Sequence, residues 1–430
     1  MFLQRLVLEN VKAIKQLELP FVTPEGKPRK WTLLLGENGS GKTTVMQAIG
    51  LLLVGSEGLL ELLGNCDSWI RVGQDECLLR ADLVTARGEE RRIELRIRRG
   101  DKVRDVFSRN EKALDDLDSA LAHSPRSYLT IGYGASRHIS KQHTIAGDWG
   151  GPFRHSRAQS VATLFSTDAV LNSIESWAMA LHYQLGDPGL QMIKNSLANL
   201  LPEATFESID KERQQLLFKT PDGIIPLSSL SDGYTDLAAW SGDLLYRITR
   251  IFADYKDPFT ARGLLLIDEI DLHLHPIWQR QLMTYLDARL PNFQILGTTY
   301  SPLTAHQAGE GELFVLKRED PQSAPTLYEY PGSPRTLMLH QLLLTPIFGL
   351  STVDSTQVET MRNEYKGLSA KSGSKMTRSD KKREAELRDE IEDLPDWSAQ
   401  TDYDKKQLAI LEEIQQTLQT RGQSPRDGSR

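Results

Sequence analysis

Eight consecutive residues near the start of the chain have the types and spacing of a loop that binds phosphate. Residues 36–43 have the sequence GENGSGKT, which satisfies the pattern G-x-x-x-x-G-K-[ST]. In such a loop the glycines let backbone N–H groups approach phosphate oxygens, a lysine reaches the β and γ phosphates, and a threonine hydroxyl ligates Mg²⁺. We therefore expect ATP and Mg²⁺ to bind at these residues: Gly36, Asn38, Gly39, Ser40, Gly41, Lys42, Thr43 and Thr44.

Two acidic residues that directly follow an apolar run could take part in the same chemistry. Asp268 and Glu269 come after residues 264–267, which are all leucine or isoleucine. Paired with the loop, Asp268 would hold Mg²⁺ together with Thr43, and Glu269 would act as the general base that polarises the attacking water. A strand that ends in acids also occurs without such a role, so this prediction depends on the phosphate loop.

A third candidate is the sequence LSDGY at residues 230–234, which lies directly before a predicted helix. Ser231 and Gly233 at a helix N-terminus would make a further anion site, because the free N–H groups and the helix dipole attract negative charge. Serine, aspartate and glycine are equally typical of an ordinary N-cap and turn. Spacing alone leaves both interpretations open.

The order of the three segments resembles that of the ATP-binding cassette (ABC) ATPases. The continuation DEIDLHLHP at residues 268–276 is similar to the RecF, SMC and OLD branch, whose heads work on DNA, and the similar blocks are spread over residues 1–350. The resemblance implies a head-to-head dimer in which Ser231 and Gly233 of one subunit close over the γ-phosphate held by Lys42 of the other. It also implies that Asp271 lies at the subunit interface.

Tyr300 departs from the family pattern. The sequence TTYSP at residues 298–302 matches a family motif whose third residue is usually a histidine in contact with the γ-phosphate. A tyrosine hydroxyl still donates one hydrogen bond, but the side chain is bulkier and is neutral near pH 7. We expect Tyr300 at the catalytic site, with slow hydrolysis or with ATP used mainly as a holding ligand.

Two other features of the family are less distinct in this sequence. The glutamine-bearing loop has no obvious counterpart, although GYGASR at residues 132–137 occupies its approximate place, so Arg137 or Gln142 could serve instead. His273 and His275 lie beside the carboxylates and could be proposed as metal ligands. Their i, i+2 spacing suits a strand better than a helix face, and the resemblance explains both histidines without a metal.

The sequence lacks two patterns that mark particular branches of the family. Residues 43–230 contain no sustained heptad, so coiled-coil arms are not expected, and no strand after Ser301 ends in the Asp-x-Asp pair of the OLD nucleases. The chain is similar to the compact ATPases of Septu and retron-associated antiphage systems, the PtuA type. This resemblance implies that the chain regulates a separate HNH nuclease of the PtuB type. The segments that carry this similarity are 132–134, 163–165, 174–177, 273–276 and 345–350.

Residues 82–107 are predicted to form an antiparallel ribbon with turns at Gly88 and Gly100. Apolar residues at 93, 95 and 97 alternate with mostly basic ones, so the two faces of the ribbon differ. The basic face is a candidate contact with the phosphates of DNA or RNA, and a solvated strand face is the alternative. The candidate contacts are Arg92, Arg96 and Arg98.

The remaining patterns indicate the elements that position these segments. Residues 31–35 are predicted to be a strand and residues 43–54 a buried helix, so the phosphate loop lies between them as the motif requires. Residues 237–252 have the pattern of an amphipathic helix, and residues 263–267 have that of a buried strand. Because the loop and the acids must meet, residues 1–350 are predicted to form one discontinuous head. The predicted parts are a core (1–125 and 258–350), a helical signature lobe (126–257) and a charged helical C-terminal extension (351–430) with a disordered tail from residue 421.

Composition excludes several classes of protein. The 430 residues carry a net charge of −7, with 25% charged and 39% hydrophobic residues, which is an ordinary soluble composition. No apolar run approaches the ~18 residues that span a membrane, so no membrane partner is expected. Two cysteines outside any metal-ligand pattern favour the reducing cytoplasm. The mild acidity argues against wholesale coating of nucleic acid but is compatible with a local basic patch.

These inferences together predict an α/β fold, a P-loop NTPase of the ABC-ATPase head type with a mixed sheet and an antiparallel ribbon. Its predicted work is ATP-gated control of an HNH nuclease in phage defence, in a head-to-head dimer or higher homo-oligomer. Two alternatives stay open. One is a RecF-like DNA-repair ATPase without a nuclease partner, and the other is a structural scaffold that binds ATP with little turnover. A nuclease activity within this chain and a transporter role are not expected.

Overall fold

In a computed structural model of the chain, the strand that precedes the phosphate loop lies within a six-stranded mixed sheet. In order across the sheet, the strands are β15 (Thr326–Glu329), β14 (Leu313–Lys317), β3 (Trp31–Gly36), β13 (Phe293–Thr299), β12 (Gly263–Ile267) and β6 (Leu129–Tyr133). Every neighbouring pair is parallel except β14 with β15. Strands β3, β12 and β13 are buried throughout, as expected for apolar parallel strands covered on both faces.

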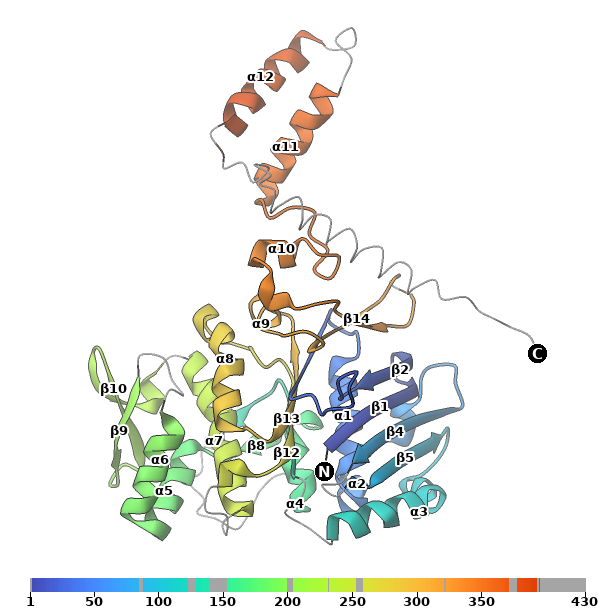
Figure 1. The fold of residues 1–430 in the computed structure, drawn as a ribbon, viewed down its shortest axis with the longest axis vertical. Helices are drawn as coiled ribbons and strands as arrows, with labels where there is room; N and C mark the ends of the chain where they lie inside the picture. The colour runs from blue at the N-terminus through green and yellow to red at the C-terminus, as the bar shows by residue number, and fades with distance from the viewer. Residues whose placement is uncertain are drawn as a thin grey trace, which may run out of the picture. The chain divides into compact units, whose positions relative to one another are not determined.

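The structure describes residues 2–84, 88–122, 129–139, 153–198, 204–230, 232–252, 258–320, 322–370, 377–392 and 394. They belong to two compact units, one that runs to Arg335 and one that starts at Thr336 (Figure 1). The predicted tail from residue 421 lies outside the described residues. In the part of the chain that the structure describes, no helix is long and apolar enough to cross a membrane.

A second, antiparallel sheet in the first unit carries the predicted basic ribbon. In order, its strands are β2 (Ile14–Pro20), β1 (Phe2–Val11), β4 (Glu76–Val84) and β5 (Glu90–Arg98). The side chains at 93, 95 and 97 are buried and the arginines at 92, 96 and 98 are exposed, which confirms the predicted alternation. The predicted limits of the ribbon are wrong, because β4 begins at Glu76 and the chain after the second turn forms helix α3 (Val103–Ala122). Val106, Leu114 and Leu117, at helical spacing, are buried on α3, which packs against β5.

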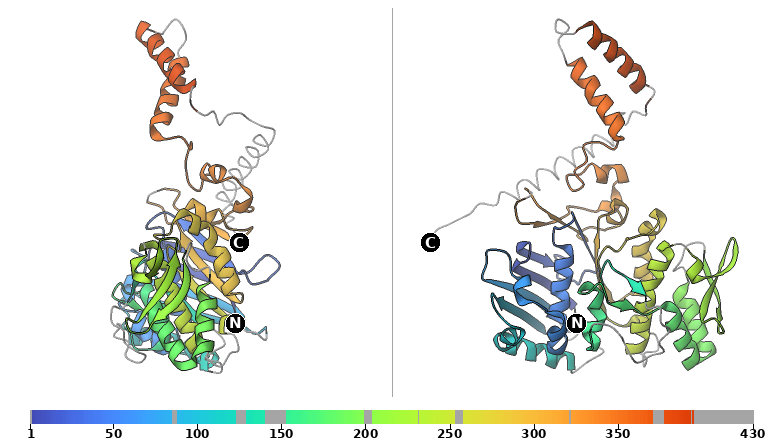
Figure 2. Two further views of the ribbon diagram at one scale, coloured as in Figure 1. Left: turned by 90° about the vertical axis from the view of Figure 1, so that its left-hand side faces the viewer. Right: turned by 180° about the vertical axis from the view of Figure 1, so that it is seen from behind.

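Helix α1 (Lys42–Leu53) packs between the two sheets (Figure 1, Figure 2). It contacts β4 and β5 of the antiparallel sheet and β3 and β6 of the central one. Nearly all of its residues are buried, as expected for a helix that is apolar on all sides. This shared core fixes the N-terminal end of α1, where Lys42 and Thr43 lie. Short helices in the same unit are α2 (Ser56–Leu62), η1 (Cys66–Trp69), α4 (Ser156–Val161) and η2 (Ala162–Leu164).

The described residues between β6 and β12 include a helical lobe built around α7 (Asp232–Ile251). A buried ion pair on α7 connects the lobe to the central sheet. Asp243, which is 0% exposed, accepts hydrogen bonds from Arg247 Nε at 2.6 Å and from the hydroxyl of Tyr133, the last residue of β6, at 2.9 Å. The other elements are α5 (Ile174–Leu185), α6 (Asp187–Leu197), β7 (His138–Ile139), β8 (Val170–Leu171), β9 (Thr205–Asp210), β10 (Gln215–Thr220), β11 (Gly223–Pro226), η3 (Leu227–Ser229) and η4 (Pro258–Thr260).

The second unit contains a hairpin of two charged helices, α11 (Thr356–Ser369) and α12 (Arg378–Glu392), which follow the short helix α10 (Leu339–Leu343). Leu368 of α11 and Leu387 of α12 are buried. Arg383 of α12 donates two hydrogen bonds of 3.0 Å to the carboxylate of Glu364 of α11. The predicted domain boundary at residue 350 falls inside this unit, which starts at Thr336.

Candidate functional site

The phosphate loop connects β3 to α1. Gly39 and Gly41 have φ angles of 75° and 105°, a left-handed region that residues with a Cβ adopt only at a cost. A Cβ at Gly36 would lie 2.5 Å from the carbonyl oxygen of Leu316, so glycine is required there as well. The Ser40 hydroxyl is buried and has no hydrogen-bond partner among the described residues. An unsatisfied polar group in a glycine-built loop fits a site whose partners are phosphate oxygens.

Lys42 lies within this loop. Its Nζ donates to the carbonyl oxygens of Gly36 at 2.6 Å and of Glu37 at 3.0 Å. Burial lowers the pKa of Lys42, and the nearby carboxylates of Asp268 and Glu269 oppose that effect. The ammonium group is therefore close to where the β and γ phosphates bind in loops of this type. Of the other predicted loop contacts, Asn38, Gly39 and Thr43 are exposed, whereas Ser40 and Thr44 are buried.

Thr43 and Asp268, the two residues predicted to hold Mg²⁺, are in direct contact. The Thr43 hydroxyl donates to Asp268 Oδ2 at 2.5 Å, and the Thr298 hydroxyl from strand β13 donates to Oδ1 at 2.5 Å. Strands β3 and β12 both pair in parallel with β13, so the loop after one strand and the acids after the other meet at one edge of the sheet. Mg²⁺ usually takes few protein oxygens and completes its shell with phosphates and water, and Thr43 with Asp268 supplies such a set. The described residues include no group of three or more His, Cys, Asp or Glu that could hold a metal ion.

Glu269, the predicted general base, has an unusual backbone conformation. Its φ angle is 48°, which costs about 1–3 kcal/mol for a residue other than glycine, so its neighbours must hold it there. The Glu269 N–H donates to Thr298 Oγ1 at 2.7 Å. Arg137 Nη2 donates to the carbonyl oxygens of Asp268 at 2.6 Å and Glu269 at 2.8 Å. The sequence indicated Arg137 only as a substitute for a missing glutamine, and the structure places its guanidinium against the backbone of the two acids.

Strand β13 also holds the third acidic residue. The Thr299 hydroxyl donates to Asp271 Oδ2 at 2.5 Å, and Asp271 is buried. Tyr300, the next residue, is 64% exposed, and the chain then enters the short helix α9 (Pro302–Ala305). Thr298 and Thr299 were not among the predicted site residues. Consecutive hydroxyl side chains at the carboxyl end of a buried strand are a signal that could have indicated them.

The described residues include only some of those predicted for this site. Gly233 lies in the first turn of α7, whereas Ser231 and Gln142 lie outside the described residues. The closure of Ser231 and Gly233 over a second subunit's phosphate therefore stays a prediction. His275 caps helix α8 (Pro276–Arg289), and its ring nitrogen Nδ1 accepts a hydrogen bond from the Ile277 N–H at 3.4 Å, so capping explains this histidine without a metal.

Each of the three arginines predicted to contact nucleic acid has a carboxylate partner. Exposed ion pairs of this kind contribute about 0–1 kcal/mol, so phosphates could displace them. The carboxylates nevertheless offset the positive charge of this face, and contact with nucleic acid stays a prediction. The pairs are Arg92 with Asp82 at 2.8 Å, Arg96 with Glu94 at 2.8 Å and Arg98 with Glu76 at 3.1 Å.

Comparisons with known proteins agree with the geometry of this site. A family model described as an AAA domain matches residues 5–144, and one described as "AAA domain, putative AbiEii toxin, Type IV TA system" matches residues 152–305. A solved structure described as the SmcHead bound to the C-winged helix domain of ScpA covers 76% of this chain and 98% of its own, at 15% identity and a TM-score of 0.47. At these values that likeness adds nothing to the assignment.

Two relatives in sequence are a Septu protein and a retron ATPase. Septu protein PtuA of Bacillus mycoides is 24% identical over 350 residues, which are 81% of this chain and 45% of that protein. The retron Ec83 probable ATPase of Escherichia coli is 27% identical over 144 residues, which are 34% of this chain and 27% of that protein. The chain thus spans less than half the length of either relative. Its sheet order, phosphate loop and acid-ended strand fit a P-loop ATPase head, and its sequence resembles that of Septu protein PtuA, in agreement with the resemblance inferred from the sequence.

Proposed function

We propose that this chain binds and hydrolyses ATP as a subunit of an antiphage defence complex, and that its nucleotide state regulates a partner nuclease of the HNH (PtuB) type. The hydrogen bond between Thr43 and Asp268 carries the proposal for ATP, because it joins the phosphate loop to the acid-ended strand in one site. The names of the Septu and retron relatives support the defence context.

In the proposed reaction, water attacks the γ-phosphate and the bond to ADP breaks. Bound Mg²⁺ would neutralise charge on the β and γ phosphate oxygens, and Thr43 and Asp268 would be its protein ligands. Lys42 and the loop N–H groups stabilise the negative charge that develops. The Glu269 carboxylate accepts a proton from the attacking water, while Thr298 and Arg137 hold its backbone in place.

We propose that the site is completed by a second copy of the chain. Asn38, Gly39 and Thr43 are exposed in the single chain, as is Tyr300, so another subunit could reach the bound nucleotide. Sedimentation of the full chain with Mg²⁺ and ATP tests this proposal. Glu269→Gln should form a dimer or larger assembly with ATP, and Lys42→Ala should not. Equal assembly of both variants with and without ATP would contradict nucleotide-bridged closure.

Control of a nuclease is tested with a candidate HNH protein of the PtuB type, which the proposal expects to be encoded near this chain. The two proteins should copurify, and cleavage of plasmid DNA by the complex should change when ATP is added. The Lys42→Ala complex should lose that response while its pairing with the nuclease stays intact. Cleavage that is indifferent to ATP and to Lys42→Ala would reject the regulatory role and leave the ATPase assignment untouched.

Tyr300, which stands where the family pattern has a histidine, favours a second candidate function, a scaffold that binds ATP and barely hydrolyses it. A phenol group cannot carry the positive charge that a histidine could place beside the γ-phosphate. Tyr300→His should then raise turnover above that of the parent. A parent that hydrolyses ATP over many turnovers, and no more slowly than Tyr300→His, would exclude the scaffold.

A further inference from the structure

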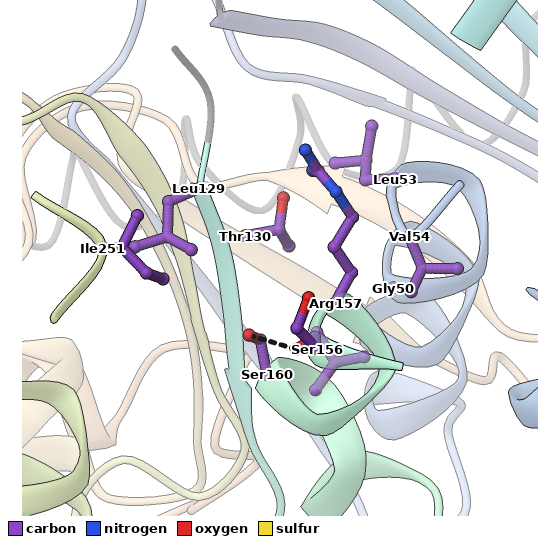
Figure 3. A pocket seen from close by; sticks show the side chains of 10 residues that line it. Gly50, Leu53, Val54, Leu129, Thr130, Ser156, Arg157, Ser160 and Ile251 are labelled. Atoms are coloured by element: carbon purple, nitrogen blue, oxygen red, sulfur yellow. Dashed lines mark hydrogen bonds between the residues drawn. The ribbon is translucent and has the colours of Figure 1, made fainter. Parts of the chain in front are cut away.

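A cavity of about 170 Å³ lies beside the C-terminal half of α1. Its described walls come from α1, α4, β6 and the end of α7, and most are apolar, among them Leu53, Leu129 and Ile251. Figure 3 shows Arg157 of α4 reaching between Leu53 of α1 and Thr130 of β6. The cavity is therefore an apolar space with one cationic side chain in its wall.

The guanidinium of Arg157 has no ion pair or hydrogen bond to any residue that the structure describes. Burial lowers the pKa of Arg157, and the charge of Asp118 opposes this only in part. Asp118 is itself engaged, because its Oδ1 accepts a hydrogen bond from the Ser56 N–H at 2.9 Å. A half-buried cation without a partner is costly, and an anion in the cavity would remove that cost.

A second polar group in the same wall also lacks a partner. The hydroxyl oxygen of Thr130 is buried and forms no hydrogen bond with the described residues. The neighbouring hydroxyl of Ser160 differs, because it donates to the carbonyl oxygen of Ser156 at 3.0 Å (Figure 3). Buried polar groups are normally satisfied, so Thr130 and Arg157 together indicate an absent ligand.

We propose that this cavity binds a small molecule that has an apolar, ring-sized body and one anionic group. A dry apolar cavity of about 150 Å³ accommodates benzene in another protein, so the volume here suits a single ring. The apolar walls would bury the ring, the planar guanidinium of Arg157 would pair with the two oxygens of a carboxylate or with a phosphate, and the Thr130 hydroxyl would add one hydrogen bond.

This site is separate from the nucleotide site but shares two elements with it. Gly50, which lines the cavity, follows Lys42 on α1 by eight residues, a rise of about 12 Å along the helix. On β6, Thr130 lines the cavity. At the other end of the strand, the backbone carbonyl oxygen of Tyr133 accepts a hydrogen bond from the Asp268 N–H at 2.7 Å. An occupant would therefore contact the helix and the strand that position Lys42 and Asp268.

Fluorine NMR of the full chain with para-fluorobenzoate tests the proposal. Saturating Mg²⁺ and ADP fill the phosphate loop, so that binding there does not contribute. The probe signal should broaden, and unlabelled benzoate should reverse the broadening. Neutral para-fluorobenzamide, which has almost the same shape, should bind at least about tenfold more weakly, because it lacks the charge that pairs with Arg157. A para-fluorophenyl phosphate probe distinguishes a phosphate from a carboxylate ligand.

The variants test which side chain recognises the anion. Arg157→Gln should weaken binding of the benzoate at least about tenfold, and Thr130→Val should weaken it less. Arg154→Gln, at an exposed arginine three residues away, is the matched control and should bind like the parent. Arg157→Lys keeps the charge without the planar fork and serves if Arg157→Gln does not fold. No binding by the parent, equal binding of the amide, or undiminished binding by the Arg157 variants would overturn the proposal.

Discussion

Arg137 should be a positioning residue for Asp268 and Glu269, the two acids proposed for catalysis, and replacing it gives a quantitative test. The Arg137 side chain is nearly buried, and its guanidinium donates to the carbonyl oxygens of Asp268 and Glu269 at 2.6 and 2.8 Å. Hydrogen bonds from a charged donor contribute about 1.5–3 kcal/mol each, so losing these two costs about 3–6 kcal/mol before the site relaxes. Arg137→Met also loses the bond from Nε to the carbonyl oxygen of Gly134 at 3.1 Å. Entry of water would recover part of this, and we expect a net loss of about 3 kcal/mol in the free energy of unfolding.

The same substitution should slow hydrolysis more than it weakens nucleotide binding. Glu269 has a left-handed φ angle of 48°, and without Arg137 its backbone can relax away from that strained conformation. A displacement of about 1 Å costs about 10²-fold in rate, so kcat should fall by that order. The affinity for ADP should change little, because the described hydrogen bonds of Arg137 go to the carbonyl oxygens of Gly134, Asp268 and Glu269 and not to the phosphate loop.

Phosphate release measures kcat, fluorescent-nucleotide binding measures the affinity for ADP, and urea unfolding measures the free energy of unfolding. Arg137→Lys should lie between the parent and Arg137→Met, because lysine supplies a charge without the planar fork. Arg335→Met is the matched control, since Arg335 is an exposed arginine paired with Glu312 at 3.1 Å, and its loss should cost at most about 1 kcal/mol. If folded Arg137→Met hydrolyses ATP at the parental rate, the positioning role is wrong.

Three further outcomes are expected. Asp243→Ala removes the carboxylate that pairs with the buried Arg247 and should cost about 3–5 kcal/mol in urea unfolding. Replacing both residues by apolar ones should recover part of that loss, and a single-variant cost below about 1 kcal/mol would contradict the buried pair. Burial raises the pKa of Cys77 from 9.0 to about 12, so the contribution of this thiol to stability is present below about pH 9 and is lost as the pH rises toward 12. The free energy of unfolding of the parent should therefore fall more than that of Cys77→Ala between these pH values. Parallel curves of unfolding free energy against pH would refute the shift. Neutralising Arg92, Arg96 and Arg98 together should weaken DNA or RNA binding and reduce the slope of log affinity against log salt concentration by up to about 2.7. Unchanged affinity and slope would show that the basic face of the ribbon does not contact nucleic acid.

The parts of the site that lie close together in the sequence could be predicted from it. The phosphate loop and the acid-ended strand each lie within ten residues, and their chemistry follows from residue types at fixed spacing. Thr298, Thr299 and Arg137 act through contacts with Asp268, Glu269 and Asp271, which depend on the pairing of β12 with β13 and β6. No local pattern specifies that pairing.

The basic ribbon illustrates the same limit. The alternation within β5 was correctly predicted, because it depends only on the period of a strand. The carboxylates that pair with Arg92 and Arg98 lie on the neighbouring strand β4, and the register of that pairing places Asp82 opposite Arg92 and Glu76 opposite Arg98. The predicted ribbon extended to residue 107, so helix α3 was missed. The helical pattern of its buried residues begins only at Val106, after the turn at Gly100.

The most direct test of the account compares ATP turnover in the parent, Lys42→Ala and Glu269→Gln under one condition. The parent should release phosphate faster than Lys42→Ala, whose loop cannot stabilise the phosphates. Glu269→Gln should retain bound ATP after gel filtration but hydrolyse it about 10²–10⁴-fold more slowly than the parent, because the general base is lost. Turnover by Glu269→Gln at the parental rate, or by the parent no faster than Lys42→Ala, would contradict the assignment of this site.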